Sequence, residues 1–136
     1  MPRPHRVLSR TEKTRLRHLV EDVERETGAE IAVLITPHVD DPERFAATYV
    51  DRVGVGKHRH DNGVLILLVM DRRVVRIELG RGLADAISPE AAQSIIEHVM
   101  APVFRAGRYG EGLLRAVEEL GRLIRAAHPA RPPQDA

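Results

Sequence analysis

The sequence contains no cysteine and no tryptophan, and its only aromatic residues are two phenylalanines and two tyrosines. Without cysteine the chain cannot form disulfides, thiolate metal sites or a cysteine nucleophile. The scarcity of aromatic rings leaves almost no platform on which bases or sugars could stack. Cysteine-based enzymes are therefore excluded, and nucleic-acid binding is disfavoured.

An excess of one charge and a long apolar segment are also lacking. The 21 basic and 20 acidic residues leave a formal charge of +1, so no bulk positive charge favours binding to nucleic acid. The longest apolar run, from Val64 to Met70, is far shorter than the ~20 residues that cross a bilayer. The first residues show no apolar signal core either. We expect a cytoplasmic protein with no nucleic-acid partner and no direct membrane insertion.

What the sequence does contain fits one globular domain. The 136 residues are 43% hydrophobic and 30% charged, which is typical of a chain that folds alone. The proline-rich ends carry little apolar surface to bury. We expect a flexible segment over residues 1–7, a domain over 8–127 and a disordered tail over 128–136.

Hydrophobic periodicity predicts the elements of that domain. The predicted order is α β α β β α α, with strands apolar enough to be covered on both faces, and the strand over 30–36 has the composition of a central strand. This order predicts an α/β fold, a three-layer α/β/α sandwich with a mixed sheet. The expected helices cover residues 9–27, 41–53, 89–103 and 110–126, and the expected strands cover 30–36, 63–70 and 74–79.

Local signals mark several helix ends. Ser9 and Glu12 have the spacing of a capping box, in which each side chain accepts a hydrogen bond from a free backbone N–H. Gly28 supplies a left-handed stop after the first helix. Ser88 is the predicted N-cap of the third helix, and Pro102 is expected to end or kink it.

The loop before the second strand carries the first candidate metal ligands. His58, His60 and Asp61 could bind a transition metal if another ligand came from elsewhere, but a solvated loop is the commoner case because a structural site takes four ligands. Asp61 and Asn62 offer the hard oxygen ligands that suit Ca²⁺ or Mg²⁺. A plain Asx turn leading into the strand explains the same residues, so both interpretations stay open.

A second glycine-broken loop runs from Gly80 to Asp85. Gly80 and Gly82 follow a strand and precede a helix, where backbone N–H groups can cradle an anion. Asp85 stands where the dinucleotide fingerprint has its third glycine, and no P-loop lysine follows, so a turn is favoured. No Gly-x-Ser-x-Gly motif occurs, and a metal-activated water is the hydrolytic route that the composition leaves most open.

Five short segments occur in a recognisable order between about Leu8 and Ile124. Together they resemble the TPM domain family, whose name joins a thylakoid lumen protein, a photosystem II repair protein and a modulator of acetylcholine receptors. The segments are Leu8-Ser9, Glu26 to Ile31, Gly56-Lys57 followed by Asp61 to Leu65, Val75 to Leu83, and Pro102 to Gly112.

The resemblance implies an α/β/α sandwich. Members of the family have been linked to divalent-metal binding, particularly of calcium, and to a weak acid-phosphatase activity. The residues that carry over are Asp61 and Asn62 on the first loop and Gly80 and Gly82, which flank Arg81, on the second.

The sequence also departs from the family pattern. The family often has an aspartate near the start of the helix after the second loop, where this chain has Ser88-Pro89-Glu90, and another between the later glycine and tyrosine, where it has Arg108. Asp85 or Glu90 could compensate. We therefore predict a weak Ca²⁺ site whose candidate ligands are Asp61, Asn62, Asp85 and Glu90.

The topology of the predicted hairpin explains why these loops should meet. Asp61 and Asn62 come just before its first strand, and Gly80 comes just after its second. Antiparallel pairing places these two positions side by side. We expect Asp61, Asn62 and the loop from Gly80 to Asp85 to lie together at one end of the sheet.

Two classes of function follow. The first is a TPM-domain interaction or regulatory module with a weak calcium site in a loop cleft and a protein partner, membrane-associated by resemblance to the family. The alternative is a metal-dependent acid phosphatase acting on phosphomonoesters. We favour the module because neither a nucleophile nor a complete metal cluster can be identified in the sequence.

Overall fold

A computed structural model describes residues 7–52 and 62–127, with the side chains of residues 51 and 52 left out of the description. The elements alternate as the hydrophobic pattern predicts, and their ends agree with the predicted ones to within about two residues. In chain order they are α1 (Arg10–Thr27), β1 (Glu30–Thr36), α2 (Pro42–Arg52), β2 (Gly63–Val69), β3 (Val74–Leu79), the 3₁₀ turn η2 (Arg81–Leu83), α3 (Pro89–Ser94), η3 (Ile95–Met100), α4 (Ala101–Arg105) and α5 (Tyr109–Ala127).

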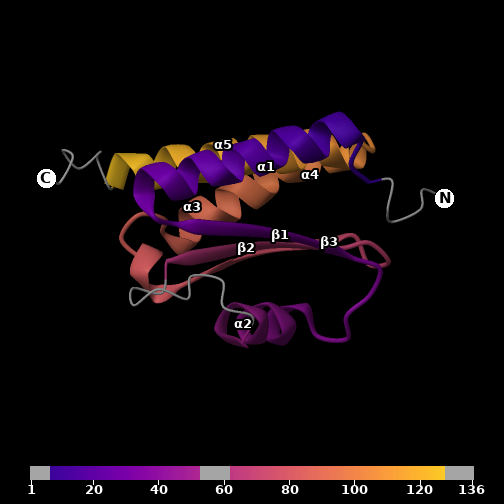
Figure 1. Ribbon diagram of the computed structural model, residues 1–136. Coiled ribbons are helices and arrows are strands. Elements are labelled where there is room, and N and C mark those ends of the chain that lie inside the picture. Colours follow the sequence, from indigo (N-terminus) through magenta and orange to yellow (C-terminus); the bar gives the residue numbers. More distant parts are fainter. Residues whose placement is uncertain (1–6, 53–61, 128–136) are drawn as a thin grey trace, which may run out of the picture.

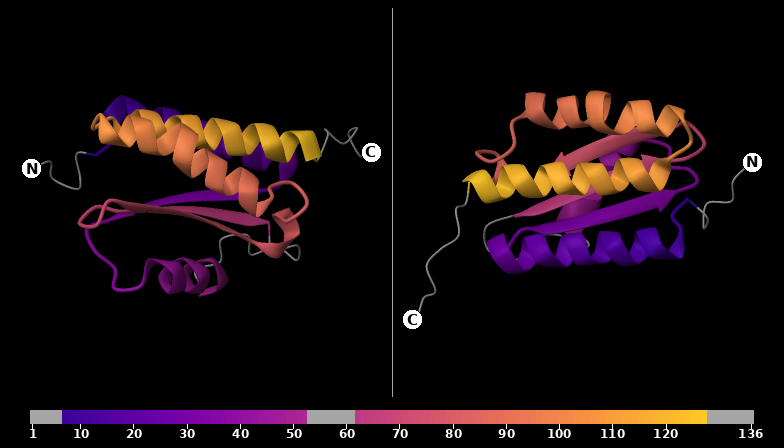
Figure 2. Two further views of the ribbon diagram at one scale, coloured as in Figure 1. Left: turned by 180° about the vertical axis from the view of Figure 1, so that it is seen from behind. Right: turned by 90° about the horizontal axis from the view of Figure 1, so that it is seen from above.

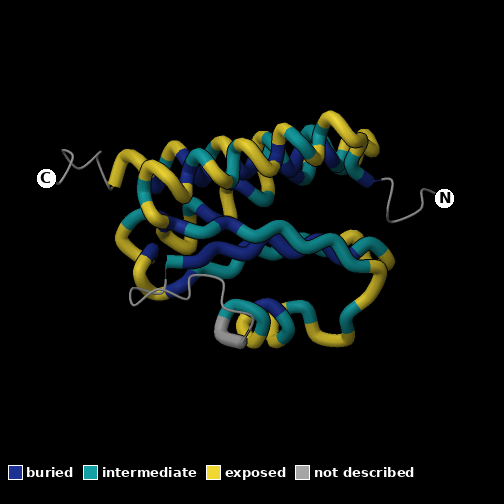
Figure 3. The backbone as a smooth tube through the Cα atoms, viewed as in Figure 1, coloured by how far each residue is buried: buried dark blue, intermediate teal, exposed yellow. Residues whose placement is uncertain are grey.

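The three strands form one mixed sheet in the order β1-β2-β3. β1 and β2 run parallel, with Glu30 opposite Gly63, whereas β2 and β3 form an antiparallel hairpin, with Val64 opposite Leu79. Every residue of β2 is buried, as Figure 3 shows for the dark central strand. The prediction of a central position for residues 30–36 is wrong, because β1 is an edge strand. β1 is apolar because helices cover both faces of the sheet, and not because a strand pairs with each of its edges.

Helices cover both faces of the sheet, and the predicted three-layer sandwich is confirmed (Figure 1). Of the described helices, only α2 packs on one face, where Ala46 packs with Leu65, Leu67 and Val69. The other helices form the opposite layer and enclose the larger core cluster. From above, α5 lies between α1 on one side and the helix that runs from α3 to α4 on the other (Figure 2).

The predicted helix ends depend on local chemistry that the structure reproduces. Ser9 and Glu12 form the capping box, with the Ser9 N–H donating to Glu12 Oε1 at 2.9 Å and the Glu12 N–H to Ser9 Oγ at 3.1 Å. Gly28 ends α1 with φ +81°, a backbone conformation that only glycine adopts without strain. Ser88 caps α3 by accepting from the Ala91 N–H at 3.0 Å.

Of the two outcomes expected at Pro102, an end or a kink, the structure excludes the end, because the helix continues past the proline with a π-turn before it. The helix that begins at Pro89 continues through Pro102 to Arg105, and its middle segment, η3, is a π-helix. There the Ala101 N–H donates to the Ile96 carbonyl, five residues back. Proline has no N–H and its ring clashes with the carbonyl four residues earlier in an α-helix. The wider turn before Pro102 gives that ring room, so the helix passes the proline without ending.

Candidate functional site

Asn62 lies where the amino ends of β1 and β2 meet. Its backbone carbonyl accepts from the Glu30 N–H at 3.0 Å, and the Gly63 carbonyl accepts from the Gly80 N–H at 2.8 Å. These two bonds extend the strand pairing by one residue, to Asn62 before β2 and to Gly80 after β3. The structure thus places Asn62 and Gly80 at the same end of the sheet, as the hairpin topology led us to expect.

The side chain of Asn62 connects this end of the sheet to the end of α1. Its Nδ2 donates to the carbonyl of Gly28, the left-handed residue that closes α1. The Oδ1 atom of the same amide is buried and has no hydrogen-bond partner within residues 7–52 and 62–127. A buried amide oxygen without a partner is uncommon, because leaving it unpaired costs free energy. It is also a hard oxygen of the kind that calcium prefers.

The loop after β3 turns at once into η2. The Leu83 N–H donates to the Gly80 carbonyl at 3.0 Å, and Leu83 is buried while Arg81 and Gly82 are exposed. Gly80 has φ −70°, an ordinary extended conformation. This geometry is that of a turn anchored by Leu83, which agrees with the favoured interpretation of the Gly80–Gly82 pair.

The predicted acidic ligands are only partly described. Asp85 and Glu90 are both exposed, and no group of three carboxylate or imidazole side chains within the described ranges is arranged to hold a metal ion. Asp61, His58 and His60 lie outside the described residues. The assignment of Asp61, Asn62, Asp85 and Glu90 to one calcium site therefore stays a prediction.

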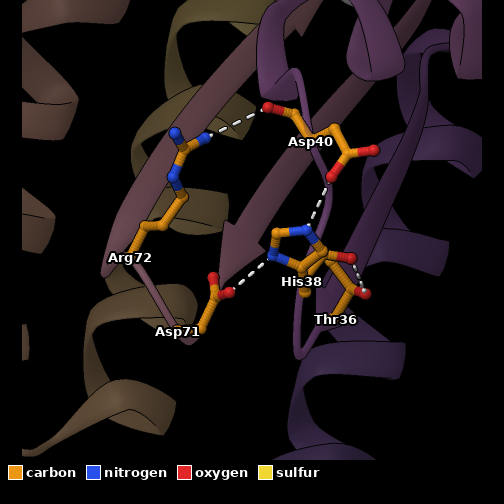
Figure 4. A network of polar contacts seen from close by, with 5 residues as sticks. All are labelled: Thr36, His38, Asp40, Asp71 and Arg72. Atoms are coloured by element: carbon orange, nitrogen blue, oxygen red, sulfur yellow. Dashed lines mark hydrogen bonds and ion pairs between the residues drawn. The ribbon is translucent and has the colours of Figure 1, made fainter.

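The opposite end of the sheet holds a polar cluster that the sequence analysis did not identify (Figure 4). Just after β1, His38 contacts two carboxylates: its Nδ1 lies 2.5 Å from Asp71 Oδ2 and its Nε2 lies 2.8 Å from Asp40 Oδ1. Arg72 donates to the Asp40 carbonyl at 3.2 Å, and the Thr36 hydroxyl donates to the His38 carbonyl at 3.4 Å. The cluster joins the loop after β1 to the turn between β2 and β3.

Backbone pairing brings the members of this cluster together. The Met70 N–H donates to the Thr36 carbonyl at 2.9 Å, and the Asp71 N–H donates to the Pro37 carbonyl at 3.0 Å. His38 and Asp71 are 33 positions apart in the chain, yet each follows the end of one of two parallel strands. Because neighbouring parallel strands end at the same edge of a sheet, the positions of His38 and Asp71 just after two strands could have indicated their contact.

Charge in this cluster favours the protonated imidazole. Hydrogen bonds to Asp40 and Asp71 raise the pKa of His38 above its ordinary value, since a doubly protonated ring can donate to both carboxylates. The side chain of His38 is 55% exposed, so water weakens both interactions. The cluster is a solvated contact and not a buried ion pair.

A shallow hollow adjoins the cluster on the side of α2. Its volume is about 450 Å³, and His38, Asp40, Arg44 and Phe45 are among its lining residues. It lies outside the carboxyl ends of the parallel strands, the usual position for ligand binding in α/β proteins. The described part of the chain thus has two candidate regions, one at each end of the sheet.

Comparison with known proteins identifies the class to which this fold and these loops belong. The chain matches the TPM domain over residues 3–123, and it is a member of the TPM domain family. None of the curated proteins matches it.

Two solved structures show the same fold. The solution NMR structure of the N-terminal domain of a protein from P. gingivalis has a TM-score of 0.83 at 29% identity and covers 95% of this chain and 83% of that one. The NMR structure of the BA42 protein from the psychrophilic bacterium Bizionia argentinensis has a TM-score of 0.82 at 20% identity, and the match covers 94% of this chain and 88% of that one. Both matches extend over almost the whole of this chain, so the helix layer and the sheet are shared together.

The length and hydropathy of the helices in the described ranges bear on whether one could span a bilayer. None of them is both long enough and apolar enough to cross a membrane.

Proposed function

We propose that this TPM domain is an interaction or regulatory module that binds calcium weakly where the amino ends of β1 and β2 meet. The observation that supports it is Asn62 Oδ1, a buried oxygen with no hydrogen-bond partner among the described residues. The Nδ2 of the same amide is held by the Gly28 carbonyl. One hydrogen bond therefore fixes the amide while leaving its oxygen free to act as a ligand.

The remaining ligands are proposed from the sequence. Asp61 directly precedes Asn62 and would supply a carboxylate, while the exposed side chains of Asp85 and Glu90 are the other acidic candidates. Arg81, also exposed on the second loop, adds opposing charge. With so few anionic ligands we expect a dissociation constant for Ca²⁺ on the order of 10⁻⁵–10⁻³ M. We further propose a cytoplasmic location and a protein partner, membrane-associated by likeness to the family.

A calcium titration followed by NMR tests this site directly. Amide signals at Asn62 and Gly80 should shift in the wild type, and Asp61→Asn should abolish these shifts. Asp71→Asn is the matched control, because it removes the same charge at the opposite end of the sheet, and it should leave calcium binding unchanged. Shifts that survive Asp61→Asn, or that centre on Asp71, would refute the proposed site.

The same protein samples distinguish the module from the metal-dependent acid phosphatase. Hydrolysis of an aryl phosphate with Ca²⁺ or Mg²⁺ present should not exceed that of a blank if the domain is only a module. Turnover that depends on the metal and disappears in Asp61→Asn would instead assign a phosphatase to the same loops.

A further inference from the structure

Within residues 7–52 and 62–127, β3 has one row of backbone groups that faces no neighbouring strand. It stands at the end of the order β1-β2-β3, and the bond from the Gly80 N–H to the Gly63 carbonyl shows which residues face β2. Because this orientation alternates along a strand, Val74, Arg76 and Glu78 also direct their N–H and C=O groups to β2. The corresponding groups of Val75, Ile77 and Leu79 point to the open edge.

A groove runs along this open edge. It has a volume of about 300 Å³ and lies between β3 and the helix above it, where Pro89, Ala92, Gln93 and Ile96 line it. An added strand would be covered on that side by the helix and would bury the partly exposed side chains of Val75 and Leu79. An exposed sheet edge is a place where proteins accept an additional strand, held by backbone hydrogen bonds.

The charges on β3 specify which strand fits. Arg76 and Glu78 flank Ile77, share one face of the sheet and lie 3.6 Å apart, with half-buried side chains. We propose that β3 pairs in antiparallel orientation with β3 of a second copy of this chain, about a two-fold axis at Ile77. In this register Arg76 stands opposite Glu78 of the copy, and Glu78 stands opposite its Arg76. Val75 stands opposite Leu79, and the open backbone groups of both strands bond to each other.

Neighbouring registers are disfavoured by the same charges. A two-fold axis at Arg76 would place two guanidinium groups opposite each other, and an axis at Glu78 would do the same with two carboxylates. Like charges directly opposite across strands are destabilising. Charged residues on an edge strand commonly prevent pairing, but here opposite signs placed symmetrically about Ile77 make the edge complementary to itself.

The state of Arg76 in one chain gives additional support. Its Nε is buried and has no hydrogen-bond partner within the described ranges, while its terminal nitrogen is 3.6 Å from Glu78 Oε1. One loose ion pair satisfies a half-buried guanidinium poorly, since this group has five donors. The carboxylate of Glu78 from the second copy would give it a further acceptor across the edge.

Charge reversal tests the proposal through the oligomeric state. Sedimentation equilibrium should show a monomer–dimer equilibrium for the wild type. Arg76→Glu and Glu78→Arg should each weaken dimerisation by roughly tenfold or more, because two attractive cross-strand pairs become repulsive. Mixing the two variants should restore a dimer, since each strand then carries one sign of charge and meets its opposite. The double reversal Arg76→Glu/Glu78→Arg should dimerise as the wild type does.

Two controls separate dimerisation from folding. Arg122→Glu breaks another ion pair, with Glu119 on α5, away from the groove, and should leave dimerisation unchanged. Circular dichroism should show that both single reversals stay folded. If a single reversal unfolds the chain, the double reversal tests self-pairing instead, because it keeps opposite charges at positions 76 and 78.

Hydrogen exchange tests the register itself. The amides of Val75, Ile77 and Leu79 should become protected as protein concentration rises, whereas those of Val74, Arg76 and Glu78 should be protected at every concentration. A chain that stays monomeric at millimolar concentration, or amides at 75, 77 and 79 that gain protection only when a different protein is added, would overturn self-pairing. These readouts involve neither Asp61 nor calcium, so their failure would not affect the proposed calcium site.

Discussion

The two ends of the sheet are built by different kinds of interaction. Where the amino ends of β1 and β2 meet, Asn62 joins strand to helix through a fixed amide, and its Oδ1 is buried. At the opposite end, His38 joins a loop to a turn through two carboxylates, and its side chain is 55% exposed. Burial makes an unpaired polar atom costly, whereas exposure lets water screen a charge. The first end should therefore matter for stability, and the second should respond to pH.

Asn62→Asp should produce the largest effect. The carboxylate cannot donate to the Gly28 carbonyl and would place negative charge beside it, so we expect a loss of about 1–3 kcal/mol in the free energy of unfolding. Urea denaturation measures this loss. Asn62→Ala is the matched control, because it removes the hydrogen bond without adding charge and should cost less. If Asn62→Asp is no less stable than Asn62→Ala, this side chain is less shielded from water than its burial indicates.

Gly28→Ala should have the next largest effect. The added Cβ would lie 3.7 Å from Asn62 Nδ2, an ordinary contact, so the cost comes from φ +81° and amounts to about 1–2 kcal/mol. Thermal unfolding should show a fall of roughly 4 °C per kcal/mol for a domain of this size. Gly107→Ala is the control, since Gly107 has φ +79° and open space around its Cβ position. A much greater cost at Gly28 would show that the contact with Asn62 also depends on the backbone there.

The smallest effect should come from the cluster around His38. Its pKa is raised in the folded chain by Asp40 and Asp71, so the stabilisation is complete below the unfolded pKa of about 6.5 and is lost as pH rises through the folded pKa. Asp71→Asn should lower the pKa of His38, as an NMR titration of the ring would show. The melting temperatures of wild type and variant should differ more near about pH 5.5 than near about pH 8.5.

Ionic strength sharpens this last prediction. Because His38 is exposed, added salt should reduce the difference between wild type and Asp71→Asn. The same salt should leave the effect of Gly28→Ala unchanged, since backbone strain carries no charge. A pH dependence that is identical in wild type and Asp71→Asn would show that this contact does not form in solution.

Most of the fold could be predicted because its signals are local. The capping box of Ser9 and Glu12, the left-handed Gly28 and the cap at Ser88 each involve residues within a few positions of one another. The alternation of apolar and charged residues over 74–79 and the apolar run after Gly63 also predict strands from nearby residues alone. The π-turn before Pro102 was not predicted, because a π-turn depends on how the helix packs and no residue type specifies it.

The candidate regions could be predicted only where one hairpin contains them. Asn62 and Gly80 flank two strands that are consecutive in the chain, so their proximity follows from antiparallel pairing alone. The contact between His38 and Asp71 requires β1 to lie parallel to β2 with Thr36 opposite Val69. Neither segment contains a residue pattern that specifies this register. The sequence analysis therefore did not identify the cluster around His38.

The sequence by itself determined which segments become helices and strands, because caps, turns and hydrophobic periods act over a few residues. Only the tertiary structure decided which strand is central. The apolar residues of β1 and β2 indicate burial on two faces, and that condition is met at the edge and at the centre of a sheet covered by helices on both sides. With β2 in the middle, β3 has an open edge among the described residues, and Asn62 and His38 lie at opposite ends of the sheet. The order of the strands depends on contacts between segments that are far apart in the chain. No local sequence pattern specifies these contacts.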